Sequence, residues 1–131
     1  MNYSVSAWSS RADEGEVKSG DNEISFGVSS ENNLPTPADL LVSAFAACCL
    51  KNVERFSEFI HFQYERAEIE VDAIRQQKPP MIQKISYNLI VISIDDINLD
   101  LLSKNLQKFG TIYNTLNASC EIEGKISIKR P

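Results

Sequence analysis

The feature that most constrains this fold is an uncharged stretch, residues 40–50, inside a segment that favours a helix. Thr36 can cap a helix whose first residue is Pro37, and Asp39 completes a short capping box. Large apolar residues lie on every side of residues 40–50, and the others are small, as is typical of a buried helix. These residues span roughly 16 Å as a helix, too little for the ~30 Å core of a bilayer. We therefore expect residues 35–60 to form a helix whose first half is enclosed in a protein core.

Alternating apolar and polar residues predict strands on both sides of this helix. We expect strands at 3–9, 24–28, 64–74, 82–94 and 119–129, and a short edge strand near 16–18. The strand at 24–28 is expected to pair with the first. The strand at 82–94 is apolar on both faces near residues 89–92, so we expect it to be central or to lie at a subunit contact. A second helix over 99–109 should end at Gly110, followed by a helical turn. This order predicts one α+β domain over residues 1–131, with helices covering a mostly antiparallel sheet.

The central helix also predicts an assembly. One small sheet cannot cover a helix that is apolar on every side. A second copy of the chain would supply the missing cover, so we expect a homodimer.

Composition excludes several classes of function. The net charge of −5, without a run of like charges, argues against a nucleic-acid partner. The N-terminal residues lack the pattern of a secretory signal, and three cysteines, two of them adjacent, do not suit a disulfide framework. We therefore expect a cytoplasmic protein without a membrane segment. His61 is the single histidine, and we expect neither a metal site nor a cofactor.

A motif in the central helix gives the chain a family resemblance. The pattern P-x-x-L-L-x-x-A-x-x-A-C is matched by Pro37, Leu40, Leu41, Ala44, Ala47 and Cys48. With this motif and its strand order, the chain resembles the OsmC/Ohr superfamily. The resemblance implies an intertwined homodimer with two buried central helices wrapped by sheets. It also implies a response to oxidative stress in which a thiol peroxidase reduces organic hydroperoxides.

The resemblance implies site residues, and the chain departs from the family at some of them. Cys48 matches the cysteine that attacks the peroxide. The family's glutamate position holds Ala38, and Gly110 stands where the second cysteine is expected. Arg11 is the one arginine before the helix and the candidate partner of the thiolate; its alternative role is a solvated loop charge.

Five further residues are predicted to line the pocket: Asp39, Cys49, Gly110, Tyr113 and Asn114. Asp39 and Cys49 also have simpler explanations, a helix cap and a small core residue. Tyr113 and Asn114 could equally form a surface turn. Cys48 itself is either a reactive thiol or a packing residue.

Two functional hypotheses follow. In the first, the protein is a one-cysteine thiol peroxidase that acts on organic hydroperoxides through Cys48 and depends on an external thiol reductant. In the second, it is a non-catalytic relative that binds a small hydrophobic ligand in a pocket at the dimer interface. The retained Cys48 favours the first hypothesis, and the missing glutamate and second cysteine favour the second.

Overall fold

The computed structural model describes residues 1–11, 13–29 and 32–131. Their contacts divide the chain into two compact units, Met1–Leu41 and Val42–Pro131. The expectation of one domain over residues 1–131 stays a prediction.

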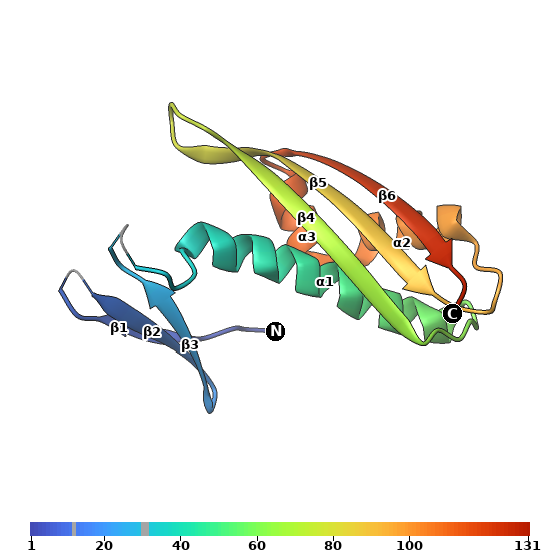
Figure 1. The fold of residues 1–131 in the computed structure, drawn as a ribbon, viewed down its shortest axis with the longest axis horizontal. Helices are drawn as coiled ribbons and strands as arrows, with labels where there is room; N and C mark the ends of the chain where they lie inside the picture. Colours follow the sequence, from blue (N-terminus) through green and yellow to red (C-terminus); the bar gives the residue numbers. More distant parts are fainter. Residues whose placement is uncertain (12, 30–31) are drawn as a thin grey trace. The chain divides into compact units, whose positions relative to one another are not determined.

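The first unit contains a small antiparallel sheet (Figure 1). Its strands are β1 (Ser6–Ser9), β2 (Glu14–Ser19) and β3 (Asn22–Gly27), in the order β1-β2-β3. The predicted pairing of β3 with the first strand is wrong, because β2 is longer than expected and pairs with both neighbours. The segment near residues 16–18 is thus central and not an edge. Short turns cause this order, since they pair strands that follow each other in the sequence.

The start of the long helix has the predicted capping box. Helix α1 covers Pro37–Phe59. The Thr36 backbone N–H donates to Asp39 Oδ2 at 2.9 Å, and the Asp39 N–H donates to Thr36 Oγ1 at 3.1 Å. These hydrogen bonds hold the pKa of Asp39 below its usual value. Two otherwise unsatisfied N–H groups are thereby paired, which fixes where the helix begins.

The second unit contains a sheet of β4 (Arg66–Gln76), β5 (Met81–Ile92) and β6 (Glu121–Lys129), with β5 in the centre as predicted. The β4–β5 pair is antiparallel, as are the pairs of the first unit. The β5–β6 pair is parallel, because α2 (Leu99–Phe109) and α3 (Thr111–Asn117) carry the chain back along the sheet between the two strands. The α+β class is confirmed, with one parallel pair in a mostly antiparallel arrangement.

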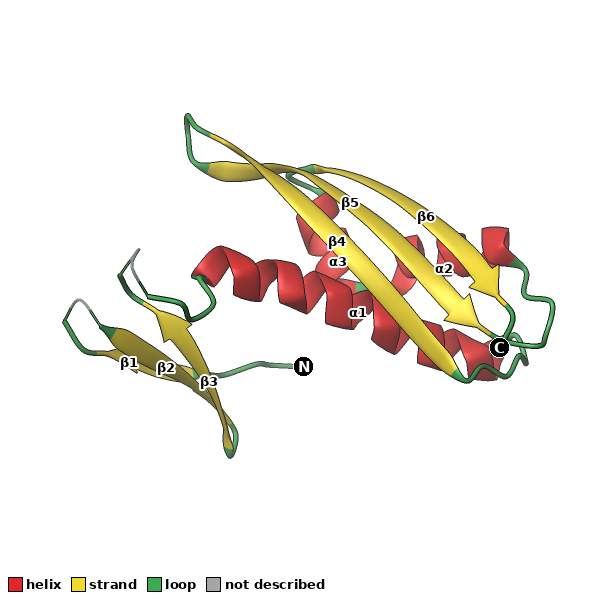
Figure 2. Ribbon diagram, viewed as in Figure 1, coloured by secondary structure: helices red, strands yellow, loops and turns green. Residues whose placement is uncertain are grey.

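The core of this unit lies between the sheet and its helices. Figure 2 shows the helices on one face of the sheet β4-β5-β6. Phe45 and Val53 of α1, Ile85 and Leu89 of β5, and Leu102 of α2 are all 0% exposed. Along β4 the predicted alternation of half-buried and exposed residues holds as far as Asp72 and then ends, close to a register shift after Ile74.

Helix α1 carries both buried and exposed residues. Its fully buried residues form one stripe: Phe45, Cys49, Asn52, Val53, Phe56 and Ser57. In the uncharged stretch, Leu41 is 42% exposed, and Ser43 and Ala47 are exposed too. Within the described residues, no helix is both long enough and apolar enough to span a membrane. Residues 40–50 thus include both buried and exposed side chains, and their expected enclosure with the help of a second copy of the chain stays a prediction.

Candidate functional site

The two adjacent cysteines of α1 have different surroundings. Neighbouring residues on a helix point about 100° apart. Cys49 therefore enters the core, where it is 1% exposed, whereas Cys48 is half-buried. Burial, followed by the nearby Cys48, raises the pKa of the Cys49 thiol to about 12. Cys49 is thus a neutral thiol near pH 7, and Cys48 is the accessible member of the pair.

A residue that was not predicted from the sequence contacts Cys48. Asn52 lies one helical turn further along α1 and is 8% exposed. Its Nδ2 donates to the Cys48 backbone oxygen at 3.0 Å and lies 3.6 Å from Cys48 Sγ, within the range for a hydrogen bond to sulfur. The signal in the sequence was an amide four residues after a cysteine on an otherwise apolar helix face.

Gly110 lies against the same turn of α1. It ends α2 and begins α3, and its N–H donates to the Leu106 carbonyl at 3.1 Å. A Cβ at this position would lie 2.8 Å from the Leu106 oxygen, 2.9 Å from Tyr113 Cβ and 3.3 Å from Asn52 Nδ2. The φ of −75° is ordinary for any residue, so this position requires glycine because there is no space for a side chain.

Aromatic rings form the buried side of this region. The Phe45 ring lies 5.8 Å from the rings of both Tyr87 and Tyr113, measured between centroids. Burial is the main cause of the raised pKa of both tyrosines. It raises the pKa of Tyr87 to about 12, and it also raises the pKa of Tyr113. Tyr113 is therefore a buried residue and not part of a surface turn. Asn114 is exposed, and its Nδ2 donates to the Lys108 carbonyl at 3.2 Å.

The remaining predicted site residues belong to the first unit. Arg11 is exposed in the turn between β1 and β2, and Asp39 holds the capping box. The structure therefore brings together Cys48, Asn52, Gly110 and Tyr113 in the second unit. The roles of Arg11 and Asp39 at the thiol stay predictions.

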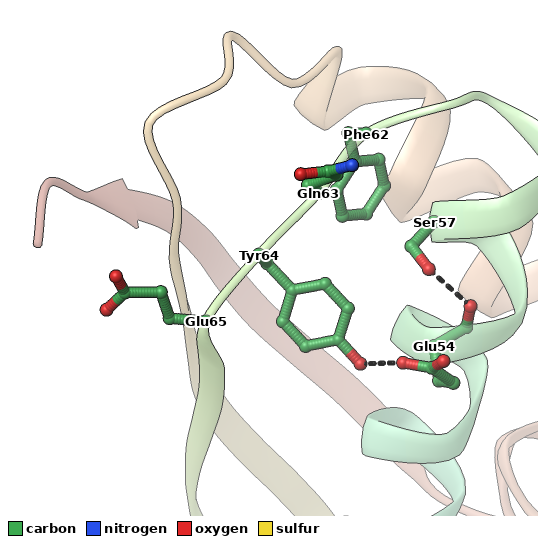
Figure 3. Close-up of a pocket in the computed structure, with 6 residues that line it drawn as sticks. All are labelled: Glu54, Ser57, Phe62, Gln63, Tyr64 and Glu65. Carbon is green, nitrogen blue, oxygen red and sulfur yellow. Dashed lines mark hydrogen bonds between the residues drawn. The ribbon is translucent and has the colours of Figure 1, made fainter.

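A separate hollow of about 420 Å³ opens at the far end of α1. It is lined by Glu54, Ser57, Phe62, Gln63, Tyr64 and Glu65. Figure 3 shows Tyr64 and Glu54 pointing toward each other, and the Tyr64 hydroxyl donates to the Glu54 carboxylate. Burial and this hydrogen bond raise the pKa of Tyr64 to about 12. The lining is mostly polar, so this hollow does not match the predicted pocket for a hydrophobic ligand, which stays a prediction.

Among the residues that the structure describes, no group of three or more His, Cys, Asp or Glu side chains is arranged to hold a metal ion. The chemical capacity of the region is that of a half-buried thiol beside an amide donor.

Comparisons with known proteins agree on one family. Residues 30–125 match the family model described as OsmC-like protein. No curated protein matches the sequence. Among solved structures, an OsmC-like protein from Mycoplasma pneumoniae has a TM-score of 0.88 at 15% identity, covering 98% of this chain and 97% of that one.

Two further structures are named for resistance to organic hydroperoxides. OsmC from Legionella pneumophila has a TM-score of 0.72 at 12% identity, covering 98% of this chain and 97% of that one. OhrB from Bacillus subtilis has a TM-score of 0.64 at 17% identity, covering 98% of both chains. At these identities the likeness establishes a shared fold.

Proposed function

The chain belongs to the OsmC family, and on this premise we propose that it is a one-cysteine thiol peroxidase that reduces organic hydroperoxides through Cys48. The observation that carries the proposal is the position of Cys48, which matches the family motif and is half-buried beside a hydrogen-bond donor. The names of the Legionella and Bacillus proteins support the choice of substrate class. Arg11 stays the predicted cationic partner of the thiolate. We also propose a reducing, cytoplasmic setting, which keeps Cys48 available as a thiol.

The first step is the oxidation of Cys48. Its thiolate attacks one oxygen of the hydroperoxide, an S–O bond forms, and the O–O bond breaks. The leaving alkoxide takes up a proton and departs as an alcohol, while Cys48 becomes a sulfenic acid. The sulfur is oxidised by two electrons, and the peroxide is reduced by two.

The second half of the cycle needs thiols from outside the chain. Gly110 has no thiol and no space for one. Cys49 faces the core, and Cys120 is half-buried with its Sγ donating to the Leu116 carbonyl at 3.2 Å. One external thiol therefore condenses with the sulfenic acid, which gives a mixed disulfide and water. A second thiol then releases Cys48 and leaves as a disulfide with the first.

Replacing the thiol tests this function. We expect Cys48→Ser to abolish the protein-dependent consumption of cumene hydroperoxide in the presence of dithiothreitol, because a serine hydroxyl is not ionised near neutral pH. Cys120→Ser is the matched control and should keep the wild-type rate, measured by the loss of hydroperoxide with time. A wild-type rate equal to the buffer rate, or a Cys48→Ser rate equal to the wild-type rate, would contradict the proposal.

We further propose that the protein is a homodimer joined along α1. Leu41, Ser43 and Ala47 are exposed on a helix without charges in this stretch, and a second copy would remove this surface from water. In sedimentation equilibrium the wild type should be a dimer. Ala47→Glu should dissociate it, since an unpaired charge in an apolar interface costs several kcal/mol.

Ala73→Glu provides the control for this substitution. Ala73 is an exposed alanine on β4, so the same change of size and charge there should leave the dimer intact. A monomeric wild type, or an Ala47→Glu variant that associates as strongly as the wild type, would refute the proposed contact.

A further inference from the structure

Asn52 is an unusual residue for its position. It is 8% exposed among apolar core residues of α1. A buried amide costs free energy unless its polar atoms are paired. The other buried polar residue of α1 is Ser57, whose hydroxyl donates to the Glu54 carbonyl at 2.6 Å. Ser57 is therefore accounted for by the helix backbone, whereas Asn52 also contacts the sulfur of Cys48.

The amide group can make both contacts at the same time. A carboxamide nitrogen carries two N–H donors. One is directed to the Cys48 carbonyl at 3.0 Å, and this bond holds the amide in place. The sulfur lies 3.6 Å from the same nitrogen, within reach of the second N–H. The donor is thus already oriented before any charge develops on the sulfur, so little reorganisation is needed.

The ionisable groups on the buried side of this part of α1 are uncharged near neutral pH, whereas Lys51, three residues after Cys48, is an exposed lysine on the same helix. Burial raises the pKa of Cys49 and of Tyr87 to about 12 each, and it also raises the pKa of Tyr113. Gly110, on the other side of Asn52, has no side chain. The Asn52 amide is a buried polar side chain that lies within hydrogen-bond reach of the sulfur.

We propose that the Asn52 amide donates a hydrogen bond to the Cys48 sulfur and stabilises the reactive thiolate. A hydrogen bond favours the charged form of its acceptor more than the neutral form. Gly110 has no thiol to resolve the sulfenic acid, so the cycle ends with an external thiol. In this cycle the role of Asn52 is to stabilise the Cys48 thiolate before it attacks the peroxide. This inference rests on the proposed function for its role in catalysis, but the effect of Asn52 on Cys48 reactivity can be measured separately.

Isosteric substitutions of Asn52 test the inference. Asn52→Leu removes the donor and replaces the amide by an apolar side chain of similar size. Cys48 alkylation by iodoacetamide at pH 7 should then slow about threefold, because the smaller fraction of thiolate is partly offset by the greater nucleophilicity of a less stabilised thiolate. The pH profile of alkylation is the readout that a merely structural role would leave unmoved. Asn52→Asp places a carboxylate beside the sulfur and should slow the reaction further.

A shared Cys120→Ser background and a control substitution show whether the change in alkylation arises at Cys48. All variants carry Cys120→Ser, and peptide mass spectrometry confirms that the label is on Cys48. Ser57→Ala removes a hydrogen bond of the same kind on the same helix. It should lower the melting temperature and leave the alkylation profile unchanged. A merely structural role of Asn52 predicts the same behaviour for Asn52→Leu as for Ser57→Ala.

The outcomes separate this inference from the proposed function. If Asn52→Leu and Asn52→Asp both give the wild-type alkylation profile, the inference is wrong, whatever the hydroperoxide assay shows. If the profile moves as expected but the wild type does not consume cumene hydroperoxide, the hydrogen bond stands and the peroxidase function fails. If both hold, hydroperoxide consumption by Asn52→Leu should also fall about threefold at pH 7.

Discussion

Phe45→Ala should lower the free energy of unfolding by about 3–5 kcal/mol, the range for removing a buried aromatic ring. Phe45 is 0% exposed and packs against Tyr87 of β5 and Tyr113 of α3. Its ring joins three elements of the second unit, so the cavity left by alanine cannot close without moving the helix or the sheet. Urea unfolding, followed by circular dichroism at one protein concentration, measures the loss.

Phe59→Ala is the matched control for this prediction. It is the same change on the same helix, but Phe59 is 64% exposed. Its ring contacts Phe56 at a centroid distance of 6.0 Å, and its loss should cost less than about 1 kcal/mol. Equal losses for the two variants would mean that the core does not lie where the structure places it.

The second large effect is expected at Gly124. This residue lies on β6 opposite Tyr87 of β5, whose ring passes over it. A Cβ at Gly124 would lie 1.9 to 2.4 Å from atoms of that ring. The ring is 7% exposed and is held by Phe45. Gly124→Ala should therefore destabilise the protein by about 3 kcal/mol, the upper part of the usual range for overpacking.

A double-mutant cycle shows whether the clash with the ring is the cause. Tyr87→Leu removes the ring atoms that the new Cβ would meet, so Gly124→Ala should cost much less in that background. Lys125→Ala, at the exposed neighbouring residue of β6, should change stability by no more than about 0.5 kcal/mol. An undiminished cost in the Tyr87→Leu background would refute the explanation.

Local signals in the sequence predicted much of the fold. Thr36 and Asp39 fixed the start of α1, because a capping box depends on residues three positions apart. The strand at 82–94 was predicted to be central because it is apolar on both faces, and β5 lies between β4 and β6. The family motif around Cys48 predicted the OsmC membership that the family model confirms.

Features that depend on contacts between distant residues were missed. The central place of β2 follows from hydrogen bonds to two neighbours, which periodicity does not encode. Gly110 was interpreted as a helix end and as a pocket-lining residue in place of the second cysteine, but the exclusion of a side chain there by Leu106 and Tyr113 was not foreseen. Asn52 was overlooked because the one signal for it, an amide four residues after a cysteine on a helix, does not form a recognised motif.

Hydroperoxides are expected to oxidise Cys48 and neither of the other two cysteines. The most direct measurement is to treat the reduced protein with one equivalent of cumene hydroperoxide, trap any sulfenic acid with dimedone, and locate the adduct by peptide mass spectrometry. We predict one adduct per chain, on Cys48, and its absence from Cys48→Ser. An untouched Cys48, or an adduct on Cys49 or Cys120 instead, would contradict the account.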